Sequence, residues 1–356
     1  MAKADHGTGS PEDHAALAAV RLAASSGVAF PLSATHYGET LAVTDPGQRR
    51  RLAHTIASIS CMRTLRSPHV LIKHQLLTAM HEQIGLPTFR PAQVEVLHTG
   101  FYWAFQGVRT RGFTIGAPDA DIPEEVLRKL PVSVTEINQW AEMRMLAGAR
   151  DQDVEALRKV GYNPEGAALS FQQRVDFESE FAAKLRTGEV KPRNSDELRV
   201  FVQAREVMHE HIDTLNELFA EYRVPFSRTF GDGDPSSRQA IVKFIDAVPS
   251  VRVAVDLKAH LFRNPQKVWT RNAVRDIDAL SAAVPYCDVV VADREMTDLL
   301  ARSGTASAMG TTVLRKISEL IDVLPPLAER AQLLGDDRTG WGGSTFRIEA
   351  LPGVDI

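Results

Sequence analysis

Hydrophobic and polar positions divide the chain into stretches of different periodicity. Within residues 1–60, apolar residues recur at helical spacing in three segments: 10–27, 33–40 and 45–60. A short apolar run, 28–33, separates the first two segments and is typical of a buried strand. Ser10 and Asp45 each precede a proline, a combination that favours a helix start. This stretch therefore predicts a helix, a strand and two further helices.

Residues 61–194 have few strand signals. Helical spacing dominates 69–85 and 133–150, and a dense aromatic cluster occupies 101–107. The charged segment 184–194 contains a glycine and a proline, which indicates a linker or surface loop. We interpret 61–194 as a mostly helical insertion.

Strand signals return in residues 195–325. Helical patterns occupy four segments: 195–222, 235–248, 272–286 and 294–304. Runs rich in β-branched residues at 287–293 and 311–317 predict strands, whereas 249–262 fits either a strand or a helix. Helices that alternate with short apolar strands indicate an α/β fold with a central parallel sheet covered on both faces. Residues 326–356 are expected to hold a helix end and a flexible tail.

Composition limits the function classes. The 356 residues carry a formal net charge of −4, so a generally basic surface is excluded but a local basic groove is not. Cys61 and Cys287 lie far apart and fit no metal-ligand spacing, which favours a reducing compartment. There is no run of 18 apolar residues, and the N-terminal segment has no apolar core typical of a signal peptide. We therefore expect a soluble, cytoplasmic protein without a membrane partner.

Four carboxylates are candidates for a metal site. Asp293 ends the 287–293 strand, Glu39 follows the 28–33 strand, and Asp276 and Asp278 lie near the start of the helix before Asp293. Ligands of open α/β sheets bind beyond the carboxyl ends of the strands, where these acids would meet. Clustered carboxylates need a cation, and oxygen ligands favour Mg²⁺ or Mn²⁺, which can activate water.

Each acid also has a structural explanation. Asp276 and Asp278 fit the acidic residues that the helix dipole favours near an N-terminus. Asp293 fits an N-cap of the helix that follows it, and Glu39 alone fits an exposed helix position. Their spacing does not decide between the two interpretations.

A basic segment lies immediately before these acids. Its arginine and lysine side chains would hold RNA phosphates and its tryptophan would stack a base; the residues are Arg263, Lys267, Trp269, Arg271 and Arg275. The alternative is a solvated loop that the tryptophan anchors to the core.

The stretch 276–293, together with 311–324, resembles the C-terminal half of a PIN-domain nuclease. The segment 28–40 resembles that family's second strand and the helix with its glutamate. The resemblance covers 1–60 and 195–325 and is nearest to a bacterial PIN-like subgroup with a helical insertion. It implies a three-layer α/β/α fold in which Glu39, Asp276 and Asp293 are metal ligands, with Asp278 competing for the middle position.

One element of the family pattern is missing. PIN domains begin with a strand that ends in a fourth acid, and residues 1–7 resemble the segment after that strand. Either the chain is truncated upstream of Met1, or the strand has been lost.

The resemblance implies a metal-dependent ribonuclease that hydrolyses RNA phosphodiester bonds. The alternative is a catalytically impaired PIN-like protein that binds RNA or another partner, and a third reading is a phosphatase with a small substrate. Single-stranded RNA is the expected partner, and a second copy of the chain in a homodimer is another. The family further implies an inhibitor protein as a partner.

Overall fold

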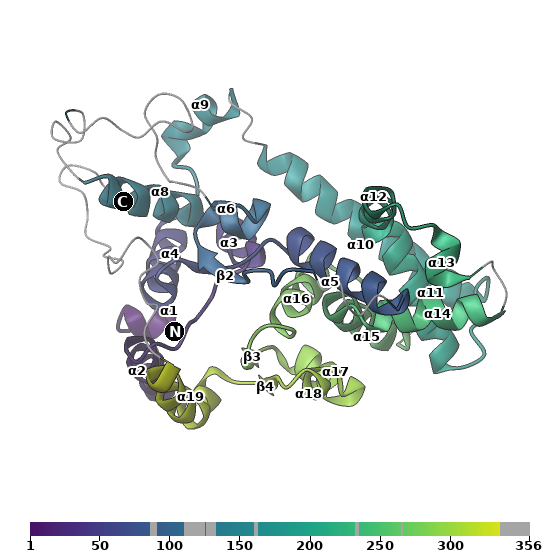
Figure 1. Ribbon diagram of the computed structural model, residues 1–356. Helices are drawn as coiled ribbons and strands as arrows, with labels where there is room; N and C mark the ends of the chain where they lie inside the picture. Colours follow the sequence, from purple (N-terminus) through teal and green to yellow (C-terminus); the bar gives the residue numbers. More distant parts are fainter. Residues whose placement is uncertain are drawn as a thin grey trace. The chain divides into compact units, whose positions relative to one another are not determined.

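The computed structural model describes residues 1–85, 91–109, 125, 133–159, 163–231, 235–264 and 266–334, which form two compact units (Figure 1). Unit 1 comprises Met1–Ser67, Glu95–Tyr162 and Lys316–Ile356; unit 2 comprises Pro68–Val94 and Asn163–Arg315. This division differs from the predicted one, which joins 1–60 to 195–325 and sets 61–194 apart. The predicted tail from residue 335 onward lies outside the described residues.

Unit 1 is built mainly from helices. Its described elements are α1 (Ala2–Asp5), α2 (Pro11–Ser25), α3 (Ala34–Ala42), α4 (Pro46–Ser60), β1 (Arg63–Leu65), β2 (Leu97–Thr99), α6 (Phe101–Gln106), α8 (Val134–Ala147), a 3₁₀ turn (Asp151–Asp153), α9 (Val154–Arg158), a second 3₁₀ turn (Ile317–Glu319) and α19 (Leu320–Leu334). Helix α2 packs on α19, and α4 packs on α8. The first helices therefore bury their apolar faces within unit 1.

Local capping explains where the first helices begin. The Ser10 hydroxyl accepts a hydrogen bond from the Asp13 backbone N–H, and the Asp13 side chain accepts one from the Ser10 N–H. Asp45 accepts a hydrogen bond from Gln48 N in the same way at the start of α4. Both helices confirm the sequence prediction.

The predicted strand at 28–33 does not form. Leu32 makes an isolated parallel bridge to Thr64, in which Leu32 N donates to Arg63 O and Leu65 N donates to Leu32 O. The next donor of this chain in a parallel ladder would be Ala34, but Ala34 is already the first residue of α3, so the pairing stops at Leu32. Strand β1 instead pairs with β2 in antiparallel register, with Thr64 opposite His98.

Unit 2 contains the longest helix of the described chain and a small parallel sheet. Its described elements are α5 (Pro68–Gln83), α10 (Pro164–Thr187), α11 (Ser195–Glu206), a π-helical turn (Val207–His211), α12 (Ile212–Tyr222), α13 (Phe226–Phe230), α14 (Pro235–Asp246), α15 (Pro249–Phe262), α16 (Arg271–Ala283), β3 (Val289–Val291), α17 (Arg294–Ser303), α18 (Thr305–Ala308) and β4 (Thr312–Leu314). No helix in the described parts of the two units has the length and apolar character that crossing a membrane requires.

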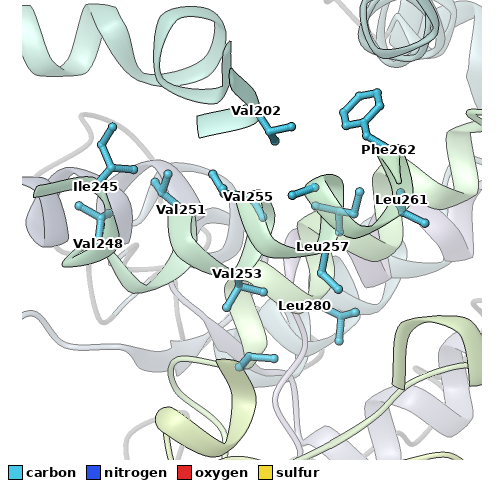
Figure 2. Packing of buried hydrophobic residues seen from close by; sticks show 14 of the residues in the cluster. Val202, Ile245, Val248, Val251, Val253, Val255, Leu257, Leu261, Phe262 and Leu280 are labelled. Atoms are coloured by element: carbon cyan, nitrogen blue, oxygen red, sulfur yellow. The ribbon is translucent and has the colours of Figure 1, made fainter. Parts of the chain in front are cut away.

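Helix α15 forms the core of unit 2. The segment that fits either a strand or a helix by its pattern is a helix, and most of its side chains are buried. Figure 2 shows Val251, Val255 and Leu257 of this helix among buried side chains of neighbouring elements. A helix with buried apolar side chains on more than one face is stable when other helices surround it. Helices α11, α14, α16 and α17 all pack against α15.

The two predicted strands near the C-terminal side of unit 2 do form. Strand β3 pairs with β4 in parallel, with Val290 opposite Val313, and α17 and α18 connect the two strands. Among the described residues, sheets have two strands each, and a central parallel sheet is not present. The described fold is therefore mostly helical with small sheets, which supports a mixed helix-and-strand class but not the predicted three-layer arrangement.

Candidate functional site

The four predicted metal ligands do not lie in one unit. Glu39 lies on α3 of unit 1 and is exposed. Asp276 and Asp278 lie near the middle of α16, and Asp293 follows β3, all in unit 2. Unit 2 therefore brings three of the four acids into one folded body.

Asp278 is bound by an arginine of another helix. Nη1 and Nη2 of Arg174, on α10, donate to the two carboxylate oxygens of Asp278 at 2.7 and 2.8 Å, which is a bidentate pair. Arg174 Nε donates to Glu210 Oε1 at 3.1 Å. Burial would lower the pKa of the Arg174 guanidinium, but Asp278 and Glu210 outweigh it and raise this pKa above its usual value. The Asp278 carboxylate is thus paired with a permanent cation, which it shares with Glu210.

Asp293 caps a helix. Its Oδ1 accepts a hydrogen bond from Met296 N at 2.8 Å at the start of α17, as the structural alternative predicts. Two residues further on, Glu295 binds Lys267 Nζ, with both carboxylate oxygens at 2.6 Å. Lys267 lies in the loop before α16, so this ion pair ties that loop to the turn at the carboxyl end of β3.

These positions allow a test of whether the acids fit a divalent cation. Both carboxylate oxygens of Asp278 face Arg174, and Asp293 already accepts a backbone hydrogen bond. Within the described ranges, no three or more His, Cys, Asp or Glu side chains are arranged to hold a metal ion. The acids, as they lie here, do not fit Mg²⁺ or Mn²⁺, and the metal site remains a prediction.

The predicted RNA-binding residues divide into two groups. Trp269 is 4% exposed and packs on Phe262, with ring centroids 4.8 Å apart, so it anchors the segment to the core. Lys267 is held by Glu295. The structural alternative is therefore correct for Trp269, and its ring does not present a face to RNA.

The three arginines of this segment lie differently. Arg263 and Arg271 are exposed, and Arg275 is half-buried. Arg271 Nε donates to Gln172 Oε1 at 3.1 Å, and the Arg275 guanidinium lies over the Phe171 ring at 5.1 Å from its centroid. Salt bridges that involve described residues include none of these three arginines.

Helix α10 contributes residues that the sequence pattern does not reveal. Phe171, Gln172 and Arg174 all contact α16 residues, which lie about a hundred positions later in the chain. Their spacing places Phe171 and Arg174 on one side of α10, which is a signal of a shared neighbour. This spacing does not identify the neighbouring helix, so the sequence pattern places α10 in the predicted insertion.

A second charged cluster lies in the core of unit 2. Lys258 Nζ, on α15, donates to Glu178 Oε1 at 2.7 Å and to Glu206 Oε2 at 2.5 Å. All three side chains are buried. Glu206 directly precedes the π-helical turn, which also carries Glu210. The signal in the sequence is a lysine between two apolar residues, Leu257 and Ala259, in a segment that also carries Arg252, Asp256 and His260.

Comparisons with known proteins do not assign this chain to a family. No family model, curated protein or solved structure matches this chain.

Proposed function

We propose that this chain binds single-stranded RNA through the surface at the start of α16 in unit 2. The observation that supports the proposal is how the charged side chains of α16 are paired. Arg271 and Arg275 contact no carboxylate among the described residues, whereas Asp278 on the same helix is paired with Arg174. The start of α16 therefore presents two guanidinium groups, those of Arg271 and Arg275, that form no ion pair with a described carboxylate.

This charge arrangement suits a phosphate backbone. Arg271 and Arg275 are four residues apart on a helix, which places them on one face with Cβ atoms about 5–6 Å apart. Arginine presents several N–H donors in a planar fork that matches phosphate oxygens. The net charge of −4 restricts such binding to a local surface, since the whole molecule repels a polyanion.

Binding of a fluorescein-labelled oligouridylate over a salt series tests the proposal. Each arginine that neutralises a phosphate of a single strand contributes about 0.7 to the slope of log affinity against log salt concentration. Arg271→Gln should reduce this slope by about that amount, and both Arg271→Gln and Arg275→Gln should weaken binding. Arg228→Gln, which removes an exposed arginine from α13, is the matched control and should change neither. Equal slopes for all four proteins would refute the proposal.

RNA hydrolysis with Mg²⁺ or Mn²⁺ is the second candidate function, as the PIN-like resemblance implies. The observation that favours it is the place of Asp293, directly after a strand with a parallel neighbour, where α/β proteins bind ligands. Among the described residues, the acids as they lie here do not form a metal-binding group.

Cleavage of oligouridylate in Mn²⁺ tests this second function. Asp293→Asn is the informative variant, because asparagine also caps helices and removes only the charge. Cleavage that is lost in this variant and in EDTA would establish hydrolysis. Binding without cleavage would leave RNA binding as the function of this chain.

A further inference from the structure

The face shared by α10 and α16 has a layered aromatic and cationic arrangement. Phe171 is partly buried and packs against the core of unit 2. The Arg275 guanidinium lies 5.1 Å from the centroid of its ring, and the Arg174 guanidinium lies 5.9 Å from it. An aromatic ring attracts a cation over its face, so Phe171 holds both arginines in place.

The two arginines differ in what else they bind. Arg174 forms ion pairs with Asp278 and Glu210, so its charge is balanced by carboxylates of the protein. Arg275 has the Phe171 ring as its described contact. Arg174 is therefore a positioning residue, whereas Arg275 has a planar charged group available to a ligand.

Gln172 extends this face to the first turn of α16. Its amide nitrogen donates to Asp176 Oδ1 at 2.8 Å, which orients the amide along α10. Its amide oxygen accepts the hydrogen bond from Arg271 Nε. Arg271 is thereby held near Arg275, and its other guanidinium nitrogens make no hydrogen bond to any described residue.

We propose that an unpaired RNA base stacks on the Arg275 guanidinium, which the Phe171 ring supports from behind, while Arg271 binds a neighbouring phosphate. This inference rests on the proposed function and gives it a substrate class, single-stranded RNA with accessible bases. Bases stack on arginine planes as well as on aromatic rings. The Arg275–Phe171 pair thus takes the stacking role that the sequence assigned to Trp269.

The arrangement selects against duplex RNA. In a duplex the bases are already stacked and paired, so a guanidinium plane cannot contact a base face without unpairing it. A duplex would still meet the charges of Arg271 and Arg275 but would gain nothing from stacking. Single-stranded RNA is therefore bound more tightly than a duplex of the same length.

Arg275→Lys separates stacking from charge. Lysine keeps the positive charge but lacks the planar group, so the salt slope should stay unchanged while affinity for oligouridylate falls about tenfold. Phe171→Leu should weaken binding in the same way, since leucine fills the space without supporting a stacked guanidinium. Arg228→Lys, the same exchange at an exposed arginine of α13, is the matched control, and its affinity should equal that of the parent.

The outcomes are distinguishable. If the parent binds with a salt slope but Arg275→Lys and Phe171→Leu both retain its affinity, the stacking inference is overturned and the proposed function stands. If the parent binds no oligouridylate at low salt, both fail. Equal affinity of the parent for oligouridylate and for duplex RNA would also overturn the inference. Thermal unfolding of each variant confirms that it is folded before its binding is compared.

Discussion

Replacing Lys258 by methionine should strongly destabilise unit 2. Lys258 is 4% exposed, and the carboxylates of Glu178 and Glu206 that it binds are 5% and 6% exposed. Burial alone would lower the pKa of the Lys258 ammonium, but Glu206 and Glu178 outweigh this effect and hold it above its usual value. The ammonium is therefore charged in the folded protein at neutral pH.

The magnitude follows from what the substitution leaves behind. Methionine nearly preserves the volume of the lysine chain, so packing changes little. Two buried carboxylates lose their shared cation, and Glu178 retains Arg205 at 3.4 Å as a weaker partner. Removal of one partner of a buried ion pair costs about 3–5 kcal/mol. We expect a loss of that size at neutral pH.

The pH dependence has a definite sign. In the parent, a raised lysine pKa contributes stability that is complete below the unfolded value of about 10.4 and is lost as pH rises through the folded value. In the variant, the carboxyl groups of Glu178 and Glu206 are buried without the lysine cation, so they should take up protons more readily. The deficit of Lys258→Met should therefore shrink as pH falls from about 7 to about 5.

Hydrogen exchange of the α15 backbone amides measures this loss within unit 2, since it reports the free energy of opening of that helix. Lys184→Met on α10 is the control: Lys184 forms an exposed pair with Glu180 and should contribute little. Combining Lys258→Met with Glu178→Leu and Glu206→Leu should recover most of the stability, because an apolar trio replaces the charges. A loss below about 1 kcal/mol for Lys258→Met alone would refute the reasoning.

Two further predictions concern unit 1. Burial raises the pKa of the Glu142 carboxyl to about 7, so the parent should lose stability as pH rises from about 4.5 to about 7. Glu142→Gln has no carboxyl group at this position and should not show this loss. Between about pH 4.5 and about pH 7, the free energy of unfolding of the variant, measured in urea, should therefore rise by about 3 kcal/mol relative to that of the parent. Gly100→Ala should destabilise unit 1 by about 1–3 kcal/mol in thermal unfolding, because Gly100 has φ +92° and a Cβ there would lie 2.5 Å from Glu142 Oε1. Unchanged melting of this alanine variant would contradict the strained geometry.

The helices were predictable where local chemistry defines them. Ser10 and Asp45 cap α2 and α4 with side chains that lie three residues from their donors. The periodicity of 249–262 does not decide between a strand and a helix, because buried positions lie on more than one face of α15. The helices packed around α15 decide its conformation. The expected strand at 28–33 failed because a strand needs a partner distant in sequence, and Leu32 alone finds one. Strands β3 and β4 were predictable because their runs of β-branched residues are flanked by helix signals.

The candidate site divides in the same way. The capping role of Asp293 could be read from the sequence, since its partner lies three residues away. The role of Asp278 could not, because Arg174 precedes it by 104 residues. The burial of Trp269 likewise depends on Phe262 and on the core around it. Sequence patterns thus identified Asp278, Asp293 and Trp269 as candidates, but not the contacts that decide which of them meet solvent.

Helix α10 decides what the surface of α16 can bind. Without Arg174, the Asp278 carboxylate would remain as a negative charge one turn from Arg275 and would repel a phosphate backbone. The same helix supplies Phe171, which supports the Arg275 guanidinium, and Gln172, which orients Arg271. Helix α10 therefore pairs the Asp278 carboxylate with Arg174 and also positions the two cations, Arg271 and Arg275. A segment that the sequence pattern sets apart as an insertion is, by these contacts, part of the proposed RNA surface.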